Sequence, residues 1–78
     1  MMKEKEFIQI LEQKGFEEVN NYDSLPYYTV LDGDVIVDII VIDGHKAMRR
    51  SLYSGEEDSH YEIGTFELIL QSLDNDSI

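Results

Sequence analysis

Carboxylates are the side chains with which this sequence could do chemistry, because it contains no cysteine and only two histidines. The densest group is Glu56, Glu57, Asp58, His60 and Glu62, which offers hard oxygen donors and one imidazole of the kind that hold divalent cations. The spacing of these residues matches no known pattern of metal ligands. We therefore expect a solvated acidic loop with no metal and no other cofactor. A small metal-assisted enzyme is the less favoured alternative.

Catalysis by a nucleophile or by paired carboxylates is not expected either. Neither Ser51 nor Ser54 lies in a Gly-x-Ser-x-Gly turn, and no glycine-rich loop is present to hold phosphate. General acid–base chemistry needs a carboxylate whose pKa is raised by burial, and only Asp38 lies within an apolar segment. We interpret Asp38 as a charge that interrupts an aggregation-prone strand and pairs with Arg49. The sequence therefore predicts a non-enzymatic protein.

The distribution of charge is the most informative property of the chain. Seventeen acids and six bases give a formal net charge of -11. Residues 15–45 contain seven acids and no base, and so do residues 51–78. These two blocks repel nucleic acids and anionic membranes and attract basic protein surfaces. Direct binding to a nucleic acid or a membrane is therefore not expected.

Carboxylates on turns and strand ends can imitate a row of phosphates. Alternate residues on one face of a strand lie about 6.6 Å apart, and duplex DNA carries a charge about every 3.4 Å along each strand. We therefore predict an inhibitor or decoy that occupies the basic nucleic-acid-binding surface of a protein partner. Phages and mobile elements often encode proteins of this description, including inhibitors of host nucleases such as CRISPR effectors, but this is an association and not a resemblance. The residues expected to contact the partner are Glu17, Glu18, Asp23, Asp32, Asp34, Glu56, Glu57, Asp58 and Glu62.

Length and composition predict a single folded domain over residues 1–78. The hydrophobic content of 42% is typical of a globular protein, and a chain of 78 residues has room for one core. The amino terminus has no apolar run or cleavage site of a secretion signal. The most apolar stretch, residues 35–42, is far shorter than the roughly 20 residues that span a bilayer. We therefore expect a cytoplasmic protein.

Two amphipathic segments predict helices near the two ends of the chain. Residues 3–14 carry apolar side chains at helical spacing, and Gly15 is expected to end this helix in a Schellman turn. Residues 65–73 carry the second apolar stripe, with Thr65 as its N-cap. Residues 74–78 are expected to fray.

The middle of the chain predicts a meander of antiparallel strands. Asp32-Gly33 and Asp43-Gly44 each follow a β-prone run, and Asp-Gly suits the two central positions of a type I′ turn. Residues 16–19 and 61–63 are expected to be short extended segments. The three main strands are Tyr27–Leu31, Asp34–Ile42 and His45–Tyr53. The predicted fold class is α+β, a small antiparallel sheet of three to four strands flanked by an N-terminal and a C-terminal helix, in the order α-β-β-β-β-α.

The two turns also predict which strand residues face each other. Turns centred on these dipeptides place Asp38 directly opposite Arg49, where opposite charges stabilise a sheet. The face expected to form the core consists of Tyr28, Val30, Val35, Val37, Ile39, Val41, Met48 and Leu52. The other face is too apolar to be fully solvated, so the alternative function is a small structural or regulatory subunit that forms a homodimer through it. The residues of this possible dimer face are Tyr27, Ile36, Ile40, Ile42 and Tyr53.

Overall fold

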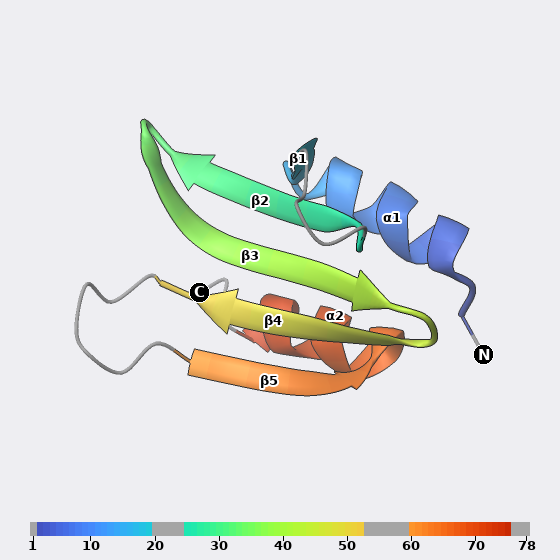
Figure 1. Ribbon diagram of the computed structural model, residues 1–78. Helices are drawn as coiled ribbons and strands as arrows, with labels where there is room; N and C mark the ends of the chain where they lie inside the picture. Colours follow the sequence, from blue (N-terminus) through green and yellow to red (C-terminus); the bar gives the residue numbers. More distant parts are fainter. Residues whose placement is uncertain (1, 20–24, 53–59, 76–78) are drawn as a thin grey trace.

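The computed structural model describes residues 2–19, 25–52 and 60–75 of the chain (Figure 1). The elements follow one another as α1 (Glu4–Gln13), β1 (Glu17–Val19), β2 (Tyr27–Asp32), β3 (Val35–Asp43), β4 (Lys46–Ser51), β5 (His60–Thr65) and α2 (Phe66–Asn75). The strands form one antiparallel sheet in sequence order, from β1 at one edge to β5 at the other. The predicted α+β fold class is confirmed, with five strands between the two helices.

Both helices lie on the same side of the sheet, behind it in Figure 1, and we call the face that neither helix covers the open face. The helices run side by side and parallel, because contacts join them at both ends. The backbone nitrogen of Met2 donates to the Glu67 carboxylate over 3.3 Å, and Lys14 Nζ lies 2.6 Å from Asp74 Oδ1. The core between helices and sheet is one cluster of Phe7, Leu11, Phe16, Tyr28, Ile40, Ile42, Ala47, Phe66, Ile69 and Leu73.

The end of α1 has the predicted Schellman geometry. Gly15 has a φ of +96°, in the left-handed region that glycine adopts without a steric cost. The N–H of Phe16 donates to the carbonyl of Leu11, and that of Gly15 to the carbonyl of Glu12, each over 3.0 Å. These two bonds satisfy carbonyls that the helix itself leaves free, and they turn the chain back toward the sheet at β1.

Helix α2 begins where the sequence predicts and ends two residues later. The hydroxyl of Thr65 accepts a hydrogen bond from the backbone N–H of Leu68 over 3.2 Å, which confirms Thr65 as the N-cap. The helix continues to Asn75, so Asp74 and Asn75 are helical and not frayed, and residues 76–78 lie outside the described residues. Neither helix of the described residues is long and apolar enough to cross a membrane.

The two hairpin turns are each centred one residue later than predicted. Gly33-Asp34 joins β2 to β3 and Gly44-His45 joins β3 to β4. The glycines have φ values of +67° and +64°, which both common hairpin turns require at their first central position. Glycine adopts this conformation more cheaply than aspartate does, so glycine takes the first position. Each register is therefore displaced from the predicted one, by two residues between β3 and β4 and by two to three residues between β2 and β3.

The predicted core face is confirmed for Tyr28 and Val30 but is wrong for β3 and for Met48. Val30 pairs with Asp38 but Leu31 pairs with Ile36, so β3 carries one extra residue in a bulge. The bulge brings Tyr28, which pairs with Ile40, onto the covered face. Ile40 and Ile42 are fully buried under the helices. These two residues form the core and cannot be an exposed dimer face.

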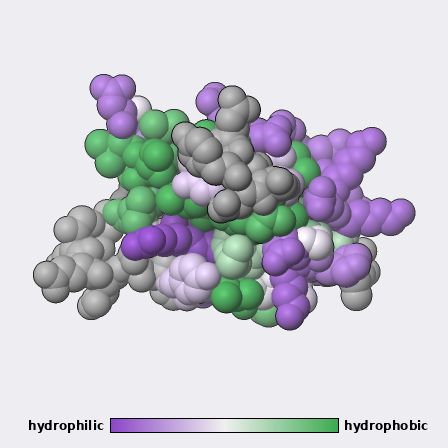
Figure 2. Space-filling view, viewed as in Figure 1, coloured by the Kyte–Doolittle hydropathy of each residue, from purple (hydrophilic) through white to green (hydrophobic). Residues whose placement is uncertain are grey.

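The open face carries an apolar row that crosses the whole sheet. Its members are paired in register on neighbouring strands: Val19, Tyr27, Val41, Met48 and Ile63. The two ends of the row are the most exposed, with 41% of Val19 and 59% of Ile63 accessible to solvent. Figure 2 views this face and shows hydrophobic side chains on it, with polar side chains among and around them. Ile36 is partly exposed and Tyr27 is half-buried, whereas Tyr53 lies outside the described residues.

Candidate acidic binding surface

Three carboxylates from two elements converge on the side of the molecule formed by α1 and β1. Tyr28 lies beneath them on β2, and its side chain is buried. Burial raises the pKa of Tyr28 above its ordinary value, and the negative charges of Glu18, Glu12 and Glu4 raise it further. Because Coulombic effects of exposed charges fade within about 10 Å, each of these carboxylates lies close to the same phenol.

The local structure explains why these acids meet. Glu4 and Glu12 lie two helical turns apart on α1, with Ile8 between them, so that they border the apolar side that packs on the sheet. The Schellman turn at Gly15 then reverses the chain, and β1 pairs with β2. Glu18 faces the same side of the sheet as Tyr28, its partner across the strands. The neighbouring Glu17 faces the open side, and both glutamates are exposed. We call Glu12, Glu17 and Glu18 the acidic edge.

Three of the six bases of the chain lie away from the acidic edge. Arg49 is buried within the protein, and the ion pair with Asp74 directs Lys14 toward α2. Lys46 follows the turn between β3 and β4, which Figure 1 places at the end of the molecule near the amino terminus. Among the described residues, no base forms an ion pair with a member of the acidic edge. The negative potential there is therefore free to act on a partner.

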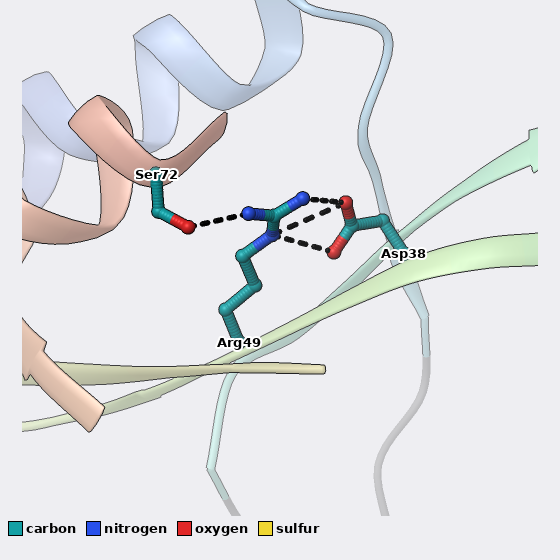
Figure 3. A network of polar contacts seen from close by, with 3 residues as sticks. All are labelled: Asp38, Arg49 and Ser72. Carbon is teal, nitrogen blue, oxygen red and sulfur yellow. Dashed lines mark hydrogen bonds and ion pairs between the residues drawn. The ribbon is translucent and has the colours of Figure 1, made fainter. Parts of the chain in front are cut away.

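Asp38 and Arg49 form a buried ion pair that is structural. Figure 3 shows the Arg49 guanidinium between the Asp38 carboxylate and the Ser72 hydroxyl. Its Nη2 donates to Asp38 Oδ2 over 2.8 Å and its Nε to Oδ1 over 3.1 Å, while Nη1 donates to Ser72 Oγ. The predicted direct opposition is wrong, because Asp38 lies opposite Ser51 and Arg49 opposite Ile40. The pair instead runs diagonally between strands and joins β3, β4 and α2.

The structure separates the acids that the sequence groups together. Glu17 and Glu18 lie on the acidic edge, and Asp32 and Asp34 are exposed at the tip of the β2–β3 hairpin. Glu62 lies on β5, at the opposite edge of the sheet, and is only half-exposed. The remaining predicted contacts lie outside the described residues: Asp23, Glu56, Glu57 and Asp58.

Glu12 is the member of the acidic edge that the sequence reasoning missed. The sequence contained a usable signal, because Glu12 lies at the end of a helix that Gly15 turns back toward Glu17 and Glu18. Helical spacing alone places Glu12 on α1, whereas its proximity to β1 depends on how that turn is completed.

No arrangement in the described part of the chain points to metal chemistry. Within residues 2–19, 25–52 and 60–75, no group of three or more His, Asp or Glu side chains could hold a metal ion. Most of the predicted acidic loop lies outside these ranges. The chain matches no known protein family, and comparisons with characterised proteins and with solved structures find no significant match.

Proposed function

We propose that the protein is a non-enzymatic binding protein whose acidic edge engages a basic surface of a protein partner. One observation carries this proposal: Glu12 on α1 and Glu18 on β1 both lie near enough to the buried Tyr28 to raise its pKa, and Glu17 adjoins Glu18 on β1. Grouped carboxylates produce a stronger local field than the same charges spread over a surface, and this field attracts cationic groups.

A nucleic-acid-binding protein is the class of partner that fits this surface best. Such proteins expose Lys and Arg side chains at the spacing of phosphates, and a carboxylate accepts hydrogen bonds from the same side chains. Seventeen acids against six bases also make approach to a nucleic acid unfavourable. The protein would therefore act as an inhibitor or decoy that competes with DNA or RNA for the partner.

The experiment is a capture assay with salt and nucleic acid as competitors. The immobilised protein is exposed to a lysate of its source cells at low ionic strength, and duplex DNA is then added to the bound fraction. A partner held through its nucleic-acid-binding surface should be released by the DNA, which occupies the basic groups of the partner. A modest increase in salt should also release it, because salt screens the same charges.

Two triple variants separate the acidic edge from net charge. Glu12→Gln, Glu17→Gln and Glu18→Gln together remove three of the 17 carboxylates from the proposed site. The matched control is Glu6→Gln, Asp43→Asn and Glu67→Gln, which removes three exposed carboxylates elsewhere. The first variant should lose the captured partner and the control should retain it. Equal retention by both variants, or a partner that DNA does not displace, would contradict the proposal.

A further inference from the structure

Strand β5 is an edge strand with little protection against pairing. It spans six residues, His60–Thr65, and all six pair with β4 in an unbroken register. No described strand pairs with its outer side. Edge strands are commonly protected by proline, lysine, a bulge, short length or inward-pointing charges; β5, HYEIGT, contains neither proline nor lysine, and Glu62 is its one acidic residue on the covered face. Its outer backbone groups can therefore pair with another strand.

The surface beside β5 carries few carboxylates, which is unusual in a protein with a net charge of -11, and its exposed charges on β4 are the bases Lys46 and Arg50, which pair with Thr65 and Tyr61. Tyr61 and Ile63 are exposed on the open face of the sheet, and Leu68 is exposed on α2. A groove of about 310 Å³ lies between α2 and β5, with Glu62 as its one charged residue. The remaining lining residues are Ile63, Leu68, Ile69, Gln71, Ser72 and Asn75.

The charged residues of α2 are directed away from this groove. Glu67 contacts the backbone of Met2, and Asp74 pairs with Lys14 on α1. The outer side of α2 therefore presents Leu68, Gln71 and neighbouring uncharged side chains. Depletion of charge at the centre of a surface is typical of protein–protein contacts.

We infer that two copies of the chain associate through β5, as antiparallel strands related by a two-fold axis, so that the two sheets become continuous. A basic partner would meet few carboxylates here and would be repelled by Lys46 and Arg50, whereas a second copy presents the same edge, poor in carboxylates, and the same outer backbone groups. A two-fold contact brings each surface against itself, so the absence of concentrated charge is what a copy with the same negative charge requires. The inference does not depend on the acidic edge.

The side chains of β5 favour one register for this pairing. With Ile63 on the axis, Ile63 lies opposite its counterpart, Tyr61 opposite Thr65, and Glu62 opposite Gly64. Gly64 brings no charge to the glutamate, and the Leu68 side chain that packs over Gly64 gives the aliphatic part of the glutamate an apolar contact. A register centred on Glu62 would place two carboxylates directly opposite each other, which destabilises a sheet. In the favoured register both α2 helices lie on the same side, and the groove beside β5 gives the second copy's side chains a place to pack.

Salt should affect this association and the acidic edge in opposite directions. Two copies of charge -11 repel each other at long range, so added salt should strengthen the dimer by screening that repulsion. Binding of a basic partner to Glu12, Glu17 and Glu18 should weaken under the same change. The two proposals can therefore fail separately.

Sedimentation equilibrium tests the dimer. The wild-type chain should pass from monomer to dimer over about a hundredfold range of concentration, at a lower midpoint in higher salt. Ile63→Lys should raise the dissociation constant at least about tenfold, because two ammonium groups would then lie opposite each other. Val19→Lys is the matched control at the other edge, where 41% of the side chain is exposed against 59% for Ile63, and it should not change the dissociation constant.

Cross-linking tests the register, and the absence of natural cysteine makes the result simple to interpret. In the favoured register the Ile63 Cα atoms lie about 4.5 to 5.5 Å apart, within reach of a disulfide, so oxidised Ile63→Cys should run as a covalent dimer. The Tyr61 Cα atoms lie about 14 Å apart, so Tyr61→Cys should not cross-link.

Either measurement can overturn the inference. A wild-type chain that stays monomeric at all concentrations and salts would exclude the dimer, and so would Ile63→Lys and Val19→Lys variants that associate equally. Cross-linking through Tyr61→Cys and not through Ile63→Cys would exclude the register. Circular dichroism on each variant distinguishes a loss of dimer from a loss of fold. We expect each variant to stay folded, because Ile63 and Val19 are exposed.

Discussion

The two edge strands of the sheet differ in length and in charge. β1 contains three residues, two of which are Glu17 and Glu18, whereas β5 contains six residues with Glu62 as its one carboxylate. A short, charged strand is a poor template for a further strand, and a longer strand with few charges is a good one. We therefore expect the β1 edge to attract cationic groups and the β5 edge to pair with another strand.

The two halves of the sheet are also fastened to the helices by different means. On the β1 side, α1 is held by apolar packing and by the Schellman turn at Gly15. On the β5 side, Arg49 reaches from β4 to Asp38 on β3 and to Ser72 on α2. Apolar packing loses stability in small steps when side chains of similar size are exchanged. Removal of one partner of a buried ion pair costs much more stability, because the other charge stays buried without a counter-charge. The β5 half should therefore be the more sensitive to a single substitution.

The largest effect is expected for Arg49→Leu. This change leaves the Asp38 carboxylate buried without its cation, at a cost of about 3 to 5 kcal/mol. The net stability of a chain of this size is also about 3 to 5 kcal/mol, so the variant should be largely unfolded. Urea denaturation followed by circular dichroism measures the difference.

A double variant tests whether the loss comes from the unpaired charge. Asp38→Leu combined with Arg49→Leu removes both charges and should recover most of the stability, because apolar residues can replace a buried ion pair at little cost. If the double variant is no more stable than Arg49→Leu alone, the ion pair is not the reason for the loss.

A smaller effect is expected for Gly15→Ala on the β1 side. At a φ of +96°, a Cβ atom costs about 1 to 2 kcal/mol of stability. Urea denaturation should show this loss, and Gln13→Ala in the last turn of α1 is a control that should change stability by less than about 0.5 kcal/mol. Equal stability of Gly15→Ala and wild type would mean that the turn does not hold β1 in place.

Loss of the N-cap of α2 should have an effect of about 1 kcal/mol. Thr65→Ala removes the hydroxyl that accepts the N–H of Leu68, while Thr65→Ser retains it. The alanine variant should unfold at lower urea concentration and the serine variant close to wild type. A serine variant as unstable as the alanine variant would point to the methyl group and not to the cap.

The smallest effect is a change in the pKa of Tyr28. Glu18→Gln removes a negative charge that raises this pKa, so the pKa should fall toward the ordinary value, while Asp43→Asn, in the turn after β3, should leave it unchanged. The absorbance of tyrosinate during an alkaline titration, compared with Tyr28→Phe, reports the change. If the pKa of Tyr28 is the same in Glu18→Gln as in wild type, Glu18 does not lie near Tyr28 and the proposed group of acids at the β1 edge is wrong.

The same group predicts a dependence of stability on pH. Because the pKa of Tyr28 is raised in the folded chain, the unfolded chain loses the proton first as the pH rises. The contribution to stability is present below pH 10.0, the ordinary pKa of tyrosine, and is lost as the pH rises through the folded value. Tyr28→Phe should lose less stability than wild type between these two values, as measured by urea denaturation at a series of alkaline pH values.

Local signals explain which parts of the fold could be predicted. The Schellman turn at Gly15 and the cap at Thr65 depend on hydrogen bonds within a few residues, so the sequence is enough to place them. The turn centres were misplaced because Asp-Gly fits a hairpin in either of two positions. The Asp38–Arg49 pair forms in spite of the register shift, because an arginine side chain is long enough to reach a diagonal partner.

The candidate site could be predicted only in part. Glu17 and Glu18 are adjacent in the chain, so their grouping needs no tertiary information. Glu12 joins them only after α1 ends and the chain reverses. Glu62 was grouped with them by charge, but the meander places β5 at the far edge of the sheet.

The sequence by itself determined the kinds of element, their order and the excess of negative charge. The elements and their order follow from local backbone preferences, and the excess of negative charge follows from the amino-acid composition. Neither changes when the chain folds. Only the tertiary structure decided which face of β3 is buried, because residues 35–42 are apolar on both sides apart from Asp38. Alternation of apolar and polar residues cannot indicate the buried face of a strand that is apolar on both faces. The buried face of β3 is therefore set by the bulge and by the burial of Arg49 beneath α2.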